Sequence, residues 1–367
     1  MGRAYDYLIV GSGLSGAVFA QEAARRGKRC LVLEKRDHIG GNVYTEELAG
    51  VTVHRYGAHI FHTDSERVWR YVNSRTACNR FVNSPLAYYR GKLYSLPFSM
   101  HTFYQLWGIT RPAEARAKLA AETAPYRGRE AANLEEQALR MVGPALYETL
   151  IKGYTEKQWG RPCRELPAGI IKRLPVRFTF DSNYYTSRYQ GIPEAGYTAL
   201  VAKLLEGAEV RLGSDFLADR AGYRALAGRT VYTGTVDSYF GYAYGPLAYR
   251  SLRFVTEVVD EADYQGVAVM NYPDLDAAYT RVIEHKHFAA GRQEKTVVTR
   301  EYPQAWEAGL EPYYPVNDEA NVARYRRYAA EAVDGVLFLG RLARYAYLDM
   351  DQAIGAALEA ADREFGA

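Results

Sequence analysis

The chain has 367 residues, of which 48% are hydrophobic and 24% are charged, which is the balance of a soluble globular protein. The net charge of +3 argues against a nucleic-acid-binding or membrane-surface protein, and the three cysteines are too scattered for a disulfide framework or a metal site. Because neither the layout of a signal peptide nor an apolar run that could span a bilayer is found, we expect a cytoplasmic protein.

The first residues predict a strand, a glycine-rich turn, a helix and a second strand. Residues 5–10 (YDYLIV) are typical of a buried strand, and GSGLSG follows at residues 11–16. The next segment, AVFAQEAARRG, has helical spacing and ends at Gly27, and residues 29–34 (RCLVLE) are typical of another buried strand. This βαβ beginning predicts a Rossmann-like dinucleotide-binding domain.

Further along the chain the patterning changes from helical to strand-like. Residues 101–165 predict several helices, with Asn133 and Glu136 spaced as in a capping box. From about residue 170, much of the sequence alternates as antiparallel strands do, in VRFTF, EVRLG, RTVYTG, LRFVTEVV, GVAVMNY, YTRVIEHKHF and KTVVTREY. GVLFLGR at residues 335–341 predicts a last buried strand before a closing helix. We therefore predict an α/β fold in which a discontinuous Rossmann-like domain carries a helical insertion domain and an antiparallel β-sheet domain.

The glycine-rich turn predicts a dinucleotide site. Gly11, Gly13 and Gly16 form GxGxxG between a strand and a helix, where glycines allow a tight turn and the close approach of a pyrophosphate. Ser12 belongs to the same turn. Glu34 ends the second strand, where a carboxylate can accept the ribose hydroxyls of the adenosine half. A plain surface loop is the alternative, and the strand–turn–helix context argues against it.

Two further segments resemble FAD proteins of the glutathione-reductase type. The first contains Lys35 and Arg36, then the pair Gly40 and Gly41, then Asn42; it is similar to the extended FAD fingerprint of those proteins. In the second, Gly340 and Arg341 end a strand similar to the one that such proteins place against the FAD pyrophosphate and ribityl chain. The resemblance implies FAD rather than NAD as cofactor. It also implies three FAD-binding segments (1–75, 191–240, 323–367), three sheet segments (76–98, 169–190, 241–322) and a helical domain with a substrate-cleft lid (99–168).

Six segments in the same order resemble bacterial UDP-galactopyranose mutases over essentially the whole chain. They are YGAHIFHT at 56–63, GYTEKQWG at 153–160, IIKRLPVRFTFDSNYY at 170–185, YTRVIEHKHF at 279–288, PYYPVND at 312–318 and YAYLDMD at 345–351. The resemblance implies an isomerase that interconverts UDP-galactopyranose and UDP-galactofuranose through an N5-flavin–sugar adduct of reduced FAD and supplies galactofuranose for cell-surface glycans. It further implies a homodimer and activation by a reductant such as NAD(P)H or a reduced flavin.

The same resemblance implies the site residues. Arg173 matches a mobile-loop arginine and Arg281 a second phosphate-binding arginine, while the backbone of His62 lies near the flavin N5 and Asp349 near both the sugar and the flavin. The matched substrate positions are Tyr154, Thr155, Trp159, Tyr184, Asn271, Tyr314 and Tyr347. The remaining matched cofactor positions are His59, Ile60 and Met350. Without the resemblance, each arginine would be a surface charge, each tyrosine a sheet residue and Trp159 a helix-packing residue.

Several alternatives stay open. Many members of the family have two phenylalanines before KGYTEKQW, whereas this chain has Leu150 and Ile151, so a mutase for a different nucleotide sugar is possible. A flavin amine-oxidase-like oxidoreductase and a non-catalytic FAD scaffold are the other readings; the arginines and tyrosines argue against both. His59 and His62 are spaced i and i+3, but the sequence places no third ligand beside them, so we expect no metal. The 32 tyrosines, against 13 phenylalanines, fit either a tyrosine-rich sheet or a polar ligand pocket.

Overall fold

A computed structural model describes residues 3–128, 130–171 and 174–366. Its first layer is a five-stranded parallel sheet in the order β16 (Val336–Phe338), β10 (Ala227–Tyr232), β1 (Tyr5–Val10), β2 (Cys30–Leu33) and β9 (Glu209–Arg211). Leu8 and Ile9 point to opposite faces of β1 and both are fully buried, because helices cover the two faces. Three helices pack against one face: α1 (Leu14–Ala24), α7 (Gly196–Leu204) and α12 (Met350–Phe365). The short α9 (Val236–Tyr239) packs against the other face.

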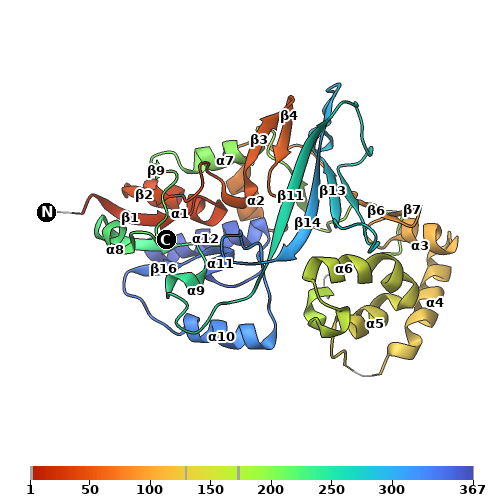
Figure 1. The fold of residues 1–367 in the computed structure, drawn as a ribbon. Helices are drawn as coiled ribbons and strands as arrows, with labels where there is room; N and C mark the ends of the chain where they lie inside the picture. The colour runs from red at the N-terminus through yellow and green to blue at the C-terminus, as the bar shows by residue number, and fades with distance from the viewer. Residues whose placement is uncertain (1–2, 129, 172–173, 367) are drawn as a thin grey trace.

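A seven-stranded sheet stands beside this layer (Figure 1). Its order is β15 (Tyr314–Pro315), β11 (Tyr249–Val259), β14 (Thr296–Ala305), β13 (Arg281–Glu284), β12 (Val269–Asn271), β6 (Leu86–Tyr89) and β7 (Lys92–Ser95), antiparallel except between β12 and β6. The register sets Asn271, Arg281 and Glu301 directly opposite one another on β12, β13 and β14. Directly opposed residues share a face of the sheet, so these three side chains form one row.

A helical part follows β7 in the sequence and lies beyond the seven-stranded sheet (Figure 1). It contains α3 (Met100–Trp107), α4 (Pro112–Thr123), α5 (Leu134–Leu146) and α6 (Lys152–Trp159), packed around a core of their own. Asn133 is the N-cap of α5 and its side chain accepts the Glu136 N–H at 3.0 Å, as its spacing predicted. α5 is kinked at Gly143, and a π-helical turn at Tyr147–Ile151 connects it to α6.

Smaller elements connect these parts. Two two-stranded sheets pair β3 (Thr45–Leu48) with β4 (Val51–His54) and β5 (Phe61–Thr63) with β8 (Tyr189–Gly191). The remaining α-helices are α2 (Glu66–Asn73), α8 (Arg220–Ala225), α10 (Glu319–Ala329) and α11 (Gly340–Ala343). Short 3₁₀ turns occur at Gly41–Val43, Ala124–Tyr126, Cys163–Glu165, Ala168–Ile171 and His285–Phe288.

The predicted fold class is confirmed, and two predicted strands need correction. VRFTF (176–180) is not a strand: it makes one isolated bridge between Val176 and Phe98, and Arg177 holds the chain in bends by donating to the Tyr184 carbonyl at 3.0 Å. YTRVIEHKHF is a strand only over Arg281–Glu284. The Glu284 carboxylate accepts the backbone N–H groups of Tyr264 and Gln265 in the loop between β11 and β12, and the chain then turns through His285–Phe288.

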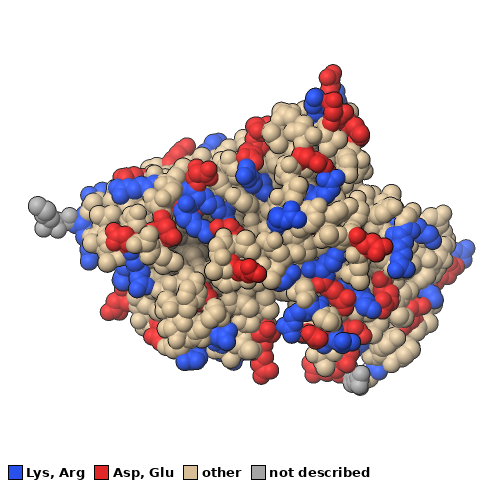
Figure 2. Space-filling model, in the orientation of Figure 1, with Lys and Arg blue, Asp and Glu red and all other residues tan. Residues whose placement is uncertain are grey.

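Basic and acidic side chains are interspersed on the face of the molecule shown in Figure 2, as the small net charge predicts. Among the described residues, none of the helices combines the length and the apolar character needed to cross a bilayer.

Candidate functional site

The glycine-rich turn joins β1 to α1 in a tightly packed arrangement. Gly11 has a φ of 99°, and a Cβ there would lie 2.2 Å from the Thr233 hydroxyl oxygen. A Cβ on Gly16 would lie 2.1 Å from the Gly11 carbonyl oxygen. A Cβ on Gly13, by contrast, would have no atom of the described residues within 4 Å. The fold itself therefore requires Gly11 and Gly16, whereas Gly13 borders open space at the N-terminus of α1.

Glu34 holds this turn in place. Its buried carboxylate accepts the Ser12 hydroxyl at 2.7 Å and the Ser12 N–H at 3.0 Å through Oε2, and the Arg36 N–H at 3.1 Å through Oε1. The acidic residue thus ties the end of β2 to the glycine turn. Its predicted contact with a ribose stays a prediction.

The segment after Glu34 presents a buried arginine with an unused donor. Arg36 donates to Asn42 Oδ1 and to Glu311, each at 2.9 Å, and Lys35 also pairs with Glu311 at 2.6 Å. Burial acts to lower the pKa of Arg36, but the Glu311 carboxylate raises it above its ordinary value. Arg36 Nη1 is buried and has no hydrogen-bond partner among the described residues. An acceptor on a bound cofactor would satisfy it.

The other predicted cofactor glycines come to the same place. Gly40 donates its N–H to the Ser12 carbonyl at 3.3 Å, and a Cβ on Gly41 would lie 3.1 Å from Gly13 Cα. A Cβ on Gly340 would lie 3.2 Å from the Ser15 hydroxyl oxygen in the first turn of α1. Three glycine segments distant in sequence therefore surround the N-terminus of α1, where a helix favours an anion.

A histidine-rich segment connects this region to the seven-stranded sheet. His59 donates its backbone N–H to His54 Nδ1 at 3.1 Å, and burial lowers the pKa of the His59 ring to about 4. Ile60 is buried in the core beside it. The His62 ring stacks on Tyr185 with centroids 3.8 Å apart; burial lowers its pKa, although Asp349 raises it. Both rings are neutral at neutral pH.

Asp349 and Met350 begin α12. Asp349 is the N-cap in a capping box with Gln352, and Met350 packs against the main core. The influence of Asp349 on the pKa of His62 places these two predicted site residues near each other, although burial has the larger effect on that pKa.

The row on the seven-stranded sheet forms the charged part of the site. Arg281 Nε donates to Glu301 Oε2 at 2.6 Å, and the Glu301 side chain is 1% exposed. Glu301 Oε1 and Asn271 Oδ1 are buried without a hydrogen-bond partner among the described residues. A Cβ on Gly57 would lie 2.8 Å from Glu301 Oε1, so the histidine-rich segment passes over this row. Two oriented acceptors and a guanidinium therefore lie together on one face.

Tyrosines surround Arg281. Burial raises the pKa of four phenols, and the charge of Arg281 lowers it. This influence means that all four phenols lie near the guanidinium; they belong to Tyr154, Tyr184, Tyr185 and Tyr314. Tyr314 stacks on the half-exposed Tyr347 with centroids 5.8 Å apart, and the Arg341 guanidinium lies 4.9 Å from the Tyr347 centroid. Because the net pKa shifts are upward, the phenols remain protonated and can donate hydrogen bonds.

The other predicted substrate residues occupy α6 or lie outside the described chain. Tyr154, Thr155 and Trp159 are on α6, and Trp159 packs against the helical core. Leu150 and Ile151 are buried in that core. Arg173 lies outside the described residues. The sequence did not point to Glu301, Glu311 or Tyr185; the alternation of TVVTREY would have placed Glu301 on a single face but not opposite Arg281.

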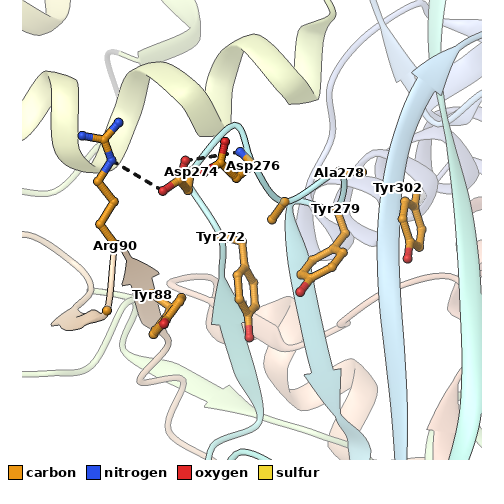
Figure 3. A pocket seen from close by; sticks show the side chains of 10 residues that line it. Tyr88, Arg90, Tyr272, Asp274, Asp276, Ala278, Tyr279 and Tyr302 are labelled. Atoms are coloured by element: carbon orange, nitrogen blue, oxygen red, sulfur yellow. Dashed lines mark hydrogen bonds and ion pairs between the residues drawn. The ribbon is translucent and has the colours of Figure 1, made fainter.

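An open pocket of about 460 Å³ lies next to the site but is not part of it. Figure 3 shows its tyrosines side by side: Tyr88 on β6, Tyr272 and Tyr279 near the ends of the loop between β12 and β13, and Tyr302 on β14. Tyr272 follows Asn271 and Tyr302 follows Glu301, so their side chains lie on the opposite face of the sheet. The abundant tyrosines thus serve both a sheet face and the Arg281 site.

One group of metal-ligand side chains lies elsewhere. Ligand atoms of Asp263, Glu284 and His287 lie within 4.8 Å of one another. The Glu284 oxygens already accept the backbone N–H groups of Tyr264, Gln265 and Gly266. Glu284 therefore shapes a turn, and we expect no metal here.

Comparison with known proteins gives consistent matches. A family model described as UDP-galactopyranose mutase matches residues 149–347, and one described as an NAD(P)-binding Rossmann-like domain matches residues 9–74. A probable UDP-galactopyranose mutase of Klebsiella pneumoniae is 42% identical, covering 97% of this chain and 94% of that protein. A dTDP-fucopyranose mutase of Escherichia coli is 40% identical, covering 96% of this chain and 97% of that protein.

A relative in Mycoplasma pneumoniae and the solved structures agree with these matches. The UDP-galactopyranose mutase of that organism is 31% identical, covering 98% of this chain and 96% of that protein. A crystal structure of reduced UDP-galactopyranose mutase shares the fold at a TM-score of 0.76 and 14% identity, covering 99% of this chain and 96% of its own. Since a family model matches residues 149–347 and relatives at 31–42% identity extend along nearly all of the chain, the protein belongs to the UDP-galactopyranose mutase family of isomerases.

Proposed function

We propose that the protein interconverts UDP-galactopyranose and UDP-galactofuranose, with reduced FAD as its cofactor. The observation that carries this proposal is the part-buried Arg281, which pairs with Glu301 and lowers the pKa of the nearby phenols of Tyr154 and Tyr314, in the part of the chain that matches the family. A fixed cation with several hydroxyl donors fits a diphosphate better than it fits the apolar or amine substrate of an oxidase.

The residues around the N-terminus of α1 fit a dinucleotide. The open side of Gly13 leaves room for a pyrophosphate, and Arg36 Nη1, which no described residue bonds, can donate to the cofactor. Glu34, Asn42, Gly340 and Arg341 belong to the segments that meet there. When bound and reduced, FAD supplies the nucleophile for the anomeric carbon of the sugar. Because the reaction has no net redox change, a reductant such as NAD(P)H or a reduced flavin is needed only for activation.

The chain's own residues have the tasks of binding and orientation. Arg281 stabilises the charge that develops on the departing diphosphate, and Tyr154 and Tyr314 donate to its oxygens. Asn271 Oδ1, a buried acceptor without a partner among the described residues, can accept a hydroxyl of the ligand. The stacked rings of Tyr314 and Tyr347 close one side of this site. Together these contacts hold the nucleoside diphosphate beside the sugar so that it can return to the anomeric carbon.

A second candidate substrate is a dTDP-linked sugar. The dTDP-fucopyranose mutase is 40% identical to this chain, against 42% for the probable UDP-galactopyranose mutase. Leu150 and Ile151, which replace a phenylalanine pair common in the family, are buried directly before α6. Overall identity therefore does not decide between the two nucleotides.

One experiment tests both candidates. Dithionite-reduced protein is incubated separately with UDP-galactofuranose and with dTDP-fucofuranose, and the products are separated by chromatography. We expect the protein to convert UDP-galactofuranose to UDP-galactopyranose, with a higher kcat/KM for this substrate than for dTDP-fucofuranose. A preference for the dTDP sugar would assign the second substrate, and conversion of neither would contradict a mutase. The family resemblance further supports a cytoplasmic homodimer that supplies galactofuranose for cell-surface glycans.

A further inference from the structure

Lys157 is enclosed by backbone carbonyls. It lies near the end of α6, and its ammonium shares three N–H donors among four carbonyl oxygens, which lie 2.6 Å (Tyr272 and Asp274), 2.8 Å (Ala277) and 2.9 Å (Tyr279) from Nζ. Burial lowers the pKa of Lys157 to about 8, which leaves it an ammonium at neutral pH. All four carbonyls belong to the loop between β12 and β13, which Figure 3 shows with Tyr272 and Tyr279 at its ends.

The same face of α6 touches the loop a second time. Gly153 lies four residues before Lys157, one turn earlier on the helix. A Cβ on Gly153 would lie 2.1 Å from the Pro273 carbonyl oxygen, so the backbone of α6 lies directly against the loop. A further contact at the end of α6 does not involve the loop: Arg250 of β11 donates to the Gln158 carbonyl at 2.9 Å.

The loop joins two residues of the substrate site. Asn271 is the last residue of β12 and Arg281 is the first residue of β13, so the loop of residues 272–280 connects these two residues in the sequence. Tyr154, whose phenol is near Arg281, follows Gly153 on α6. The Lys157 contacts therefore connect the helix that carries Tyr154 to the loop that sets Asn271 and Arg281.

We propose that Lys157 is a positioning residue for substrate binding, because it clamps the loop of residues 272–280 onto α6 and so sets Tyr154 against Asn271 and Arg281. Without the ammonium, four carbonyl oxygens would converge on one point with no donor, and the loop would have to open. The identity of the ligand in this inference rests on the proposed function. The contacts between Lys157 and the loop do not depend on that function.

The test compares Lys157→Met with Lys152→Met. Lys152 is on the same helix, but its Nζ pairs with Glu148 at 3.1 Å on the surface, so it is a matched control. For Lys157→Met we expect the same flavin content and visible spectrum as wild type, but a Kd for UDP and a KM raised roughly 10- to 100-fold. Hydrogen exchange should rise in residues 272–280 and much less in α6, which Arg250 still holds. Lys152→Met should stay within about twofold of wild type in every measurement.

Other outcomes are equally informative. Wild-type UDP affinity together with wild-type exchange of residues 272–280 in Lys157→Met would overturn the proposal, as would loss of thermal stability alone. If Lys157→Met does not fold, Gly153→Ala, which presses on the Pro273 carbonyl while keeping the ammonium, must show the same weaker binding and faster exchange. If the wild-type protein binds neither UDP nor dTDP, the proposed function fails; unchanged exchange in Lys157→Met would then reject the clamp separately.

Discussion

Arg281 and Glu301 face each other across β13 and β14 in an ion pair with a 2.6 Å Nε–Oε2 distance, in which the Glu301 side chain is buried and the Arg281 side chain is partly exposed. Burial alone would lower the pKa of Arg281, but the Glu301 carboxylate holds it well above its ordinary value. The cation is therefore permanent, and its position is fixed by a rigid strand. A guanidinium has five N–H donors, so the bond to Glu301 leaves others for a ligand.

The first prediction concerns Arg281. Replacement by Ala should lower kcat/KM by about 100-fold or more, because it removes the cation that stabilises the departing diphosphate. Flavin content should not change, since the cofactor residues lie around α1. Arg300→Ala is the matched control: Arg300 is the neighbour of Glu301 on β14, and its partner is Glu257 on the opposite face. Turnover by Arg281→Ala close to that of Arg300→Ala would show that another group binds the diphosphate.

The second prediction separates the role of Glu301 from that of Arg281. Glu301→Gln should lower kcat/KM by roughly 10-fold, because the guanidinium loses the charge that holds it. If Glu301 acts only through Arg281, adding Glu301→Gln to Arg281→Ala should cause little further loss. The measurement is a double-mutant cycle on kcat/KM. Fully additive losses would assign Glu301 a direct contact with the ligand.

The parts of the fold that depend on local chemistry could be predicted from the sequence. GSGLSG fixed the β1–α1 connection, because a Cβ at Gly11 or Gly16 would overlap neighbouring atoms and no other residue type fits. The cap at Asn133 is equally local, since it satisfies the first N–H groups of one helix. VRFTF failed because alternation alone supplies no partner strand: Arg177 binds nearby carbonyls instead.

The contacts that complete the site depend on long-range pairing. Glu301 opposes Arg281 only because of the register of two strands separated by a loop and a 3₁₀ turn. Glu311 bonds Arg36 although the two residues are 275 positions apart in the sequence. Lys157 looks like an ordinary surface lysine of a helix until the loop beyond Asn271 is folded around it. The residue pattern of one strand shows which side chains share a face, but not which strand it pairs with or which residues lie opposite.

The third prediction distinguishes a glycine required by the cofactor from one required by the fold. Gly13 has a φ of −67° and open space at its Cβ position, so Gly13→Ala should leave the melting temperature of the apoprotein unchanged while lowering its flavin content. Gly16→Ala should lower that melting temperature, because overpacking against the Gly11 carbonyl costs about 1–3 kcal/mol. Thermal unfolding of the apoproteins and the ratio of flavin to protein absorbance measure the two effects. Full flavin occupancy in Gly13→Ala would contradict a pyrophosphate at this turn.

The last prediction concerns pH and a chain of three histidines, of which His54 and His285 are buried and His59 is partly buried. His59 donates its backbone N–H to His54 Nδ1 at 3.1 Å, and His54 donates its own N–H to His285 Nδ1 at 3.2 Å. Each accepting nitrogen must be unprotonated. Burial lowers the pKa of His285 to about 3 and of His59 to about 4, and it lowers the pKa of His54 well below its ordinary value.

The unfolded chain takes up these protons near pH 6.5, whereas the folded chain resists them until about pH 4. Between those values the unfolded state binds more protons, so the free energy of unfolding must fall as the pH falls, by up to about 1.4 kcal/mol per pH unit for each histidine. Urea unfolding measured between about pH 7 and about pH 5 should show this slope. His285→Gln should reduce it whatever the variant's stability at neutral pH, because glutamine can still bond Thr299 but cannot titrate. His101→Gln, whose ring packs on Phe180 in the helical part, should keep the full slope. An unchanged slope in His285→Gln would mean that other groups govern the acid sensitivity of the fold.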